Sequence, residues 1–228
     1  MRATWLLALG IAFAIAPIQG VKTIAVSSVE IPREFRRLPR PRARFDSLIS
    51  STLRTKGFAV VPREVSESIW LRLRDSIGGY YDTYTGKLIK AKVEAVHMGM
   101  LRELHARYAV DAWLHSWIDV VSAPFTGGKV KWHGAEQESG ARGGLGGVLF
   151  GTKKGSIRAL SLYVALEDTV GTELYEGVGG IELGSQIDGG RFVDITPGLL
   201  LVDEARNATA VHLALDPLPT RLTSRPGP

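Results

Sequence analysis

Histidine is the residue type that most readily binds a metal or moves a proton near neutral pH. The chain contains five histidines, namely His97, His105, His115, His133 and His212. A zinc site on a helix places two histidines four positions apart, whereas His97 and His105 are eight positions apart. The spacing therefore predicts no metal site, and a site assembled by the fold from distant histidines stays open as an alternative.

The nucleophiles and glycine-rich segments give no catalytic pattern. There is no cysteine, which excludes a thiol nucleophile, disulfides and cysteine-bound metals. Ser139, Ser156 and Ser185, which lie near glycines, lack the Gly-x-Ser-x-Gly elbow of serine hydrolases. The glycine-rich stretch 140–155 fails the order of both the phosphate loop and the dinucleotide fingerprint. We therefore predict no catalytic residue and no cofactor.

Carboxylates and aromatic residues on predicted strands and loops leave a second possibility open. The carboxylates are Glu136, Glu138, Glu167, Asp168, Glu173 and Glu176. Because acid–base pairs are formed in space, the sequence alone does not exclude that two of these act together. The aromatic candidates for a binding groove are Tyr80, Tyr81, Tyr84, Trp113, Trp117 and Trp132. One alternative is therefore an exported hydrolase or glycan-binding protein.

A cluster of arginines between residues 33 and 44 is a candidate contact for anions. Its central members are Arg36, Arg37, Arg40 and Arg42, and the prolines among them predict irregular structure. Such a cluster suits anionic lipid, lipopolysaccharide phosphates or an acidic protein. A second alternative is therefore a peripheral binder of anionic envelope surfaces. The apolar Leu149 and Phe150, inside the glycine-rich stretch, are candidates for insertion into a partner.

The first twenty residues have the layout of a secretory signal peptide. Arg2 precedes an apolar run from Trp5 to Ala16, which is too short to span a bilayer, and Gly20 follows. Cleavage after Gly20 fits the pattern better than cleavage after Ala16. Without cysteine the chain has no site for a lipoprotein anchor, so we expect export to the periplasm by a cleaved, unlipidated leader. Export also argues against a nucleic-acid partner, although the net charge is +5.

The remaining pattern predicts one α/β domain over residues 21–219, with a mixed sheet and helices packed on it. Strands are expected at 22–29, 58–61, 110–121, 129–133, 160–167 and 172–178, and the 58–61 strand is expected to be buried. Helices are expected at about 45–56, 64–77 and 93–108, and between residue 197 and residue 215. Residues 134–156 are expected to form a flexible loop, and 220–228 a disordered tail.

Four segments occur in an order that resembles a group of bacterial envelope modules. They are Lys22–Val26, Gly57–Pro62, Val110–Ile118 and Leu160–Tyr175. The modules include the penicillin-binding-protein activator LpoB, the N-terminal domain of TolB and the curli secretion lipoprotein CsgG. The resemblance implies an anticodon-binding-domain-like fold, protein–protein contacts in the cell envelope and no catalytic residues.

These observations together favour a non-enzymatic periplasmic accessory or adaptor protein. It would present a sheet edge or a helix face to an envelope protein. Oligomeric state and partner identity do not follow from the sequence.

Overall fold

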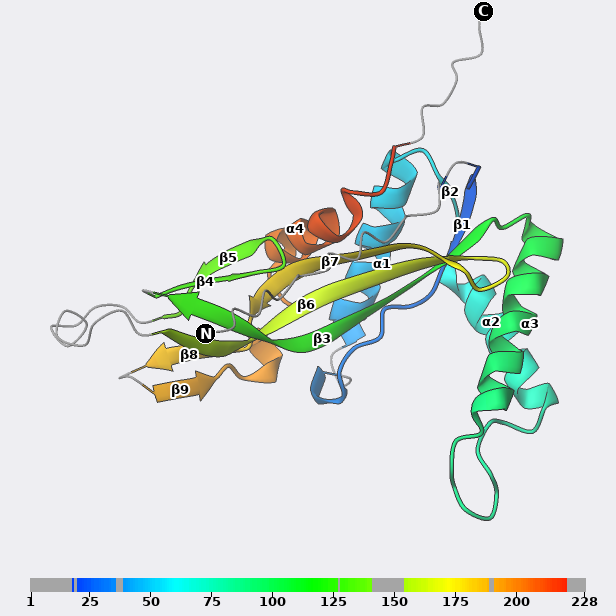
Figure 1. Ribbon diagram of the computed structural model, residues 1–228, viewed down its shortest axis with the longest axis horizontal. Coiled ribbons are helices and arrows are strands. Elements are labelled where there is room, and N and C mark those ends of the chain that lie inside the picture. Colours follow the sequence, from blue (N-terminus) through cyan, green and yellow to red (C-terminus); the bar gives the residue numbers. More distant parts are fainter. Residues whose placement is uncertain are drawn as a thin grey trace, which may run out of the picture.

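The computed structural model describes residues 18, 20–35, 39–126, 128–140, 154–188 and 191–220. A mixed sheet with helices packed against it forms an α/β fold, which confirms the predicted fold class (Figure 1). The elements are β1 (Thr23–Val26), the 3-10 helix η1 (Arg33–Phe35), α1 (Pro39–Thr55), β2 (Ala59–Val61), α2 (Arg63–Ser76), α3 (Lys90–Tyr108), β3 (Ala112–Thr126), β4 (Lys129–Trp132), β5 (Ala135–Glu138), β6 (Lys154–Asp168), β7 (Glu173–Leu183), β8 (Ser185–Asp188), β9 (Arg191–Asp194), the 3-10 helix η2 (Pro197–Leu199) and α4 (Glu204–Leu215).

The sheet joins a parallel part to an antiparallel part. β1 lies between β2 and β3 and pairs with both in parallel, because α1 and the α2–α3 pair return the chain across the sheet. β3 then pairs along its whole length with β6 in antiparallel orientation, and β6 pairs with β7. The long β3 and β6 strands therefore connect the two ends of the molecule.

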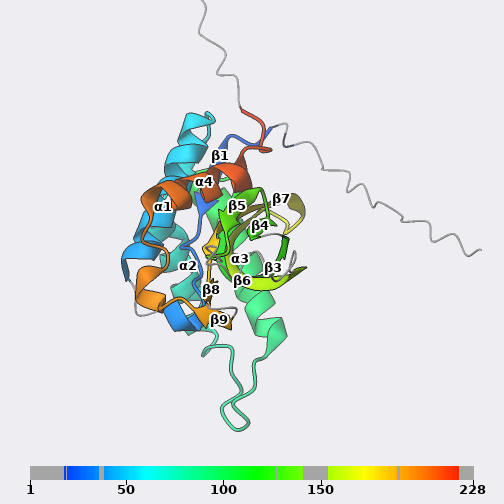
Figure 2. The same cartoon turned by 90° about the vertical axis from the view of Figure 1, so that its left-hand side faces the viewer.

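Helices α1 and α4 cover one face of this sheet (Figure 2). Alternate residues of β3 and β6, such as Leu114 and Leu162, point to this face and are fully buried. They pack with Phe45 and Ile49 of α1 and with Val211 of α4 in the largest hydrophobic cluster. The helices α2 and α3 pack at one end of the sheet, in a separate cluster that contains Ala25 and Leu104.

At the opposite end the strands curl into a closed ring. β4 pairs with β3, and β5 pairs with β4. The side chain of Gln137 on β5 then bridges to β7, with Nε2 donating to the Ile181 carbonyl at 3.0 Å and Oε1 accepting from Leu183 N at 3.2 Å. Trp132 and Phe125 are buried inside the ring. The indole nitrogen of Trp132 donates to the carbonyl of Leu160.

Several predicted boundaries were wrong. The prolines of the arginine cluster do not prevent a helix, since α1 begins at Pro39, and proline is tolerated in a first helical turn, where its missing N–H has no helical partner. β2 is partly exposed rather than buried, because it forms the edge of the sheet. The last helix begins at Glu204, where the Asp203 side chain accepts hydrogen bonds from the N–H groups of Ala205 and Arg206.

The predicted flexible loop at 134–156 also needs correction. Residues 135–138 form β5, whose backbone pairs with β4, and residues 154–156 belong to β6. The glycine content predicted a loop here because β5 and the start of β6 form through pairing with other strands, and the sequence does not show those partners. Residues 141–153 lie outside the described part of the chain. The β8–β9 hairpin was not predicted.

Candidate functional site

A continuous row of aromatic and histidine rings follows the sheet face opposite to α1 and α4. In spatial order the row contains Trp70, His97, Trp113, His115, Trp117, Tyr163 and His133. Neighbouring ring centroids are between 5.1 and 6.4 Å apart. The rings therefore touch from the helical end of the sheet to the strand ring.

The strand period explains the middle of the row. Residues 113, 115 and 117 of β3 point to the same face because side chains alternate along a strand. Tyr163 is the direct partner of Trp117 on β6. Their rings are nearly parallel, with an angle of 9° and centroids 5.3 Å apart, and the His115 ring stacks on Trp117 at 19° and 5.2 Å. Cross-strand stacking of this kind holds each ring in one orientation.

Different elements supply the ends of the row. His97 on α3 places its ring edge-on to Trp113, and Trp70 on α2 follows it. At the other end, His133 in the turn between β4 and β5 places its ring edge-on to Tyr163. His133 Nδ1 lies 2.8 Å from the hydroxyl of Ser161, which fixes the ring. All seven rings are partly exposed. The four from His115 to His133, on β3, β6 and the β4–β5 turn, are called here the exposed part of the row.

A carboxylate lies beside two of the histidines. Glu167 Oε1 is 3.0 Å from His97 Nε2 and 3.9 Å from His115 Nδ1. The hydrogen bond to Glu167 raises the pKa of His97. Burial lowers the pKa of His115, against the smaller opposing effect of the Glu167 charge. The pKa values of two histidines within reach of the same carboxylate are therefore shifted in opposite directions.

The exposed part of the row combines neutral rings with nearby negative charge. Burial lowers the pKa of His133 and raises the pKa of Tyr163. The charges of Asp119 and Glu176 raise the pKa of Tyr163 further. Trp113 Nε1 is buried without a hydrogen-bond partner in the structure. Within the described ranges, no group of three His, Cys, Asp or Glu side chains could hold a metal ion.

Three of the six predicted carboxylates already have partners in the structure. Glu136 is held by Lys129 at 2.8 Å and by Lys131 at 2.9 Å on the outside of the strand ring, and these bonds lower its pKa to about 2. Asp168 accepts hydrogen bonds from the backbone of the turn after β6. Glu167 lies beside His97 and His115, toward the helical end of the row. These three of the six carboxylates thus have partners of their own.

The predicted aromatic groove was partly correct. Trp113 and Trp117 belong to the row. Tyr80 and Tyr81 continue it beyond Trp70, with ring centroids 6.3 Å apart between Trp70 and Tyr80 and 5.8 Å apart between Tyr80 and Tyr81. Trp132 is instead buried inside the strand ring, and Tyr84 is almost fully exposed at 97%. The sequence prediction missed five members, Trp70, His97, His115, Tyr163 and His133. The alternation Trp113-x-His115-x-Trp117 was the available signal, because three rings at a period of two must share a face.

The structure describes only part of the predicted arginine site and none of the predicted loop site. Arg42 is exposed on α1, and the backbone of Arg40 lies in the first turn of that helix. Arg36, Arg37, Leu149 and Phe150 lie outside the described part of the chain. The predicted contacts of these residues therefore stay predictions.

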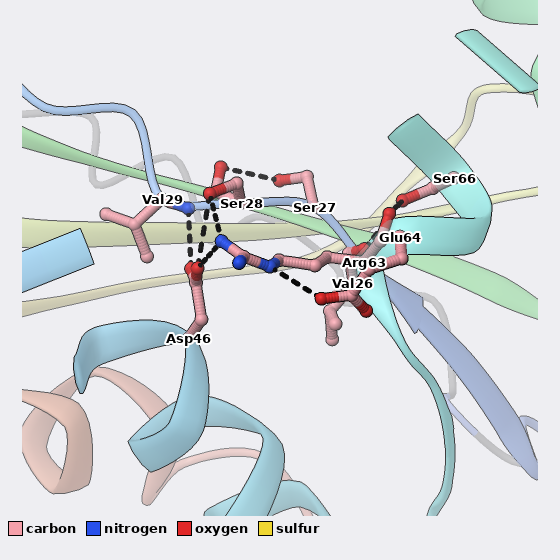
Figure 3. Close-up of polar contacts among 8 residues, drawn as sticks. All are labelled: Val26, Ser27, Ser28, Val29, Asp46, Arg63, Glu64 and Ser66. Carbon is pink, nitrogen blue, oxygen red and sulfur yellow. Dashed lines mark hydrogen bonds and ion pairs between the residues drawn. The ribbon is translucent and has the colours of Figure 1, made fainter. Parts of the chain in front are cut away.

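A second polar cluster joins α1, α2 and the segment after β1 (Figure 3). Asp46 accepts hydrogen bonds from Val29 N at 2.8 Å and from the Ser28 hydroxyl at 3.2 Å, and it forms an ion pair with Arg63. Burial raises the pKa of Asp46, and these bonds and the Arg63 charge oppose the rise. Because all of its groups bind one another, we interpret this cluster as a structural connection between helices.

No helix among the described residues has the length and apolar character needed to cross a membrane. No protein-family model matches the chain, and a search of the curated proteins found no match either.

Proposed function

We propose that this chain is a non-enzymatic accessory protein of the bacterial periplasm that binds an envelope protein. Its contact surface is the exposed part of the ring row, which consists of His115, Trp117, Tyr163 and His133. The observation that carries the proposal is the stack of Trp117 on both His115 and Tyr163, partly open to solvent. Residues 1–20 are proposed to export the chain and then to be removed.

The stacked rings have the properties of a protein contact. Tryptophan and tyrosine are enriched among the residues that contribute most binding energy at interfaces. Their stacking fixes the side chains before the partner arrives, so little conformational entropy is lost on binding. The carboxylates of Asp119 and Glu176 act on Tyr163. They favour a partner that brings basic or apolar side chains to the row.

A protein partner explains the carboxylates better than hydrolysis does. A glycosidase needs two carboxyl groups facing one another across the scissile bond. Here Glu136 is neutralised by two lysines, while Asp168 is used by backbone N–H groups. Trp117 already stacks on two neighbours, which leaves less ring surface for a sugar.

Site-specific photo-crosslinking in whole bacteria tests this function. A photoreactive phenylalanine analogue replaces Trp117 or Tyr163 in separate variants, and Tyr108 on α3 in a matched control. Both test positions should give the same discrete adduct with one envelope protein. Position 108 should not give this adduct, because it lies on another surface.

Competition makes the result specific. Unlabelled wild-type chain should suppress the adduct, whereas a Trp117→Ala, Tyr163→Ala double variant should not, provided that its circular dichroism matches the wild type. A protein adduct that forms equally from position 108 would refute the proposed surface. An adduct with glycan alone would replace the protein partner by the glycan-binding alternative.

A further inference from the structure

The turn between α2 and α3 carries the most exposed aromatic side chain among the described residues. Tyr84 is 97% exposed, Tyr81 58% and Leu88 49%. In both views the turn extends beyond the end of the α2–α3 pair, away from the body of the molecule (Figures 1 and 2). These side chains therefore form a projecting apolar tip, defined here as residues 80–88.

Internal hydrogen bonds give the tip a defined shape. Asp82 Oδ1 accepts from Tyr84 N at 3.0 Å and from Thr85 N at 2.7 Å, which lowers the pKa of Asp82. Tyr81 and Leu88 form an antiparallel bridge. The exposed rings are thus presented by a turn that is ordered from within, and little order has to be gained when they make a contact.

The base of the tip is attached to the helices. The hydroxyl of Tyr80 accepts a hydrogen bond from Trp70 Nε1 at 3.2 Å, and Lys92 Nζ donates to the carbonyls of Ile77 and Gly79. The sequence from Gly78 to Lys92 contains three lysines, at 87, 90 and 92, and one acid, Asp82. Lys87 and Lys90 are exposed beside the apolar side chains. Two exposed lysines therefore follow the exposed tyrosines closely along the chain.

We propose that the tip binds the surface of a bilayer that contains anionic phospholipid. Tyrosine rings favour the boundary between headgroups and hydrocarbon, because their ring is apolar and their hydroxyl is polar. Lysines beside them are attracted to the headgroup phosphates. This contact lies on the turn beyond α2 and α3, and its exposed side chains, Tyr81, Tyr84 and Leu88, do not belong to the part of the ring row that is proposed to bind a protein.

The size of the tip favours a lipid surface over a protein partner. A stable protein interface removes about 800 Å² from each partner and involves roughly 20 to 30 residues on each side. Three exposed apolar side chains on one turn fall well short of that number. A membrane surface has no such minimum, since a few inserted rings and nearby lysines give a weak, reversible association.

The absence of cysteine allows a local measurement in the full chain. A single Thr83→Cys substitution, labelled with a nitrobenzoxadiazole fluorophore, reports the environment of the tip. A matched Ser51→Cys label on α1 reports an exposed position elsewhere. With vesicles of phosphatidylcholine and phosphatidylglycerol, the label at 83 should brighten and shift to shorter wavelength, whereas the label at 51 should not. Because the label is local, adsorption through residues 1–20 does not produce this difference.

Substitutions in the labelled chain separate the two contributions. Lys87→Gln with Lys90→Gln should weaken the vesicle affinity by about 25-fold, since each of the two lysines near an anionic surface contributes roughly a fivefold factor. Tyr81→Ser with Tyr84→Ser should abolish the shift of the label. Tyr108→Ser, which removes an exposed tyrosine from the far end of α3, should change neither result.

Three outcomes would overturn the proposal. They are an equal response of the label at 83 to vesicles of pure phosphatidylcholine, an unchanged affinity of the lysine variant, and an equal loss in the Tyr108→Ser control. Each variant is first compared with the wild type by urea unfolding. The ring row stays intact in all of them, so failure here leaves the proposed protein partner untouched.

Discussion

Glu167 faces two histidines whose pKa values are shifted in opposite directions by the fold. Its hydrogen bond to His97 favours the protonated imidazole, whereas burial between Trp113 and Trp117 favours the neutral form of His115. The ordinary pKa of both side chains is 6.5. Folding therefore raises one of these pKa values and lowers the other, and each shift makes the stability of the fold depend on pH.

The two histidines should contribute to stability with opposite pH dependence. The pKa of His97 is raised on folding, so its contribution is fully present below pH 6.5 and is lost as the pH rises through the folded value. The pKa of His115 is lowered, so its contribution is present above pH 6.5 and is lost as the pH falls through the folded value. Unfolding free energies from urea titrations between about pH 5 and pH 8 measure both.

Single substitutions assign each effect. The advantage of wild type over His97→Gln should shrink as the pH rises, and the advantage over His115→Gln should shrink as the pH falls. His212→Gln, at an exposed position on α4, is the control for the chemical effect of replacing a histidine by glutamine. Parallel curves for the first two variants would contradict the assignment.

Ile18 is the residue at which the predicted leader and the fold disagree. It is 8% exposed and belongs to the largest hydrophobic cluster, and its carbonyl accepts a hydrogen bond from Val21 N at 3.1 Å. Cleavage after Gly20, which the sequence pattern favours, would remove it. Cleavage after Ala16 would keep it. Burial therefore favours the cut that the pattern ranks second.

A chain that begins at residue 17 should be more stable than one that begins at residue 21, by about 1.5 to 3 kcal/mol for the burial of an isoleucine. Chemical unfolding of the two chains measures the difference, and Ile18→Ser in the longer chain should remove most of it. Equal stability of both chains would show that Ile18 adds nothing. Mass spectrometry of exported protein then identifies the natural end, and an intact Met1 would refute export with cleavage.

At the scale of elements, hydrophobic periodicity predicted the regular structure well. The alternation from Leu160 to Leu166 predicted the centre of β6, and the helical spacing of Phe45, Ile49 and Leu53 predicted α1. Proline and glycine misled the prediction, because their effect depends on position. Pro39 and Pro41 fall in the first helical turn, where proline is allowed, and the glycines after Glu138 do not prevent β5 from pairing with β4.

Glycines in β7 determine how closely α4 approaches the sheet. A Cβ atom added at Gly179 would lie 2.0 Å from the carbonyl oxygen of Ala210, and one added at Gly177 would lie 2.0 Å from that of Ala214. Both atoms belong to the backbone of α4, which has no side-chain freedom to move away. The helix and the strand can thus pack at this distance only while both positions are glycine.

Gly179→Ala should lower the free energy of unfolding by about 2 to 3 kcal/mol, because the added methyl group must displace α4 from β7. Gly198→Ala is the matched control, since nothing lies within 4 Å of its added Cβ and its stability should change little. Denaturant titration followed by circular dichroism compares the variants. A Gly179→Ala protein as stable as the control would show that α4 shifts without cost.

At the scale of the whole molecule, the order and register of the strands could not be predicted from the sequence. The candidate ring row exists because β3 and β6 pair in one register over fifteen residue pairs, and a shift by one residue would turn Trp117 to the other face. His97 and His133 reach the row from α3 and from the β4–β5 turn. No local pattern indicates these long-range positions, so the sequence predicted Trp113 and Trp117, and Tyr80 and Tyr81 beyond the end of the row, but not the row itself.

The five strand junctions that close the strand ring differ in their hydrogen bonds. Four of its five junctions are ladders of backbone hydrogen bonds, whereas the β5–β7 junction depends on the amide of Gln137 and the bond from Gly180 N to the His133 carbonyl. Rotation of the Gln137 side chain would leave the Gly180–His133 backbone bond as the remaining hydrogen bond named at this junction, and the other four junctions would still enclose Trp132. This end of the molecule can therefore open locally at the β5–β7 junction while the rest of the sheet stays folded.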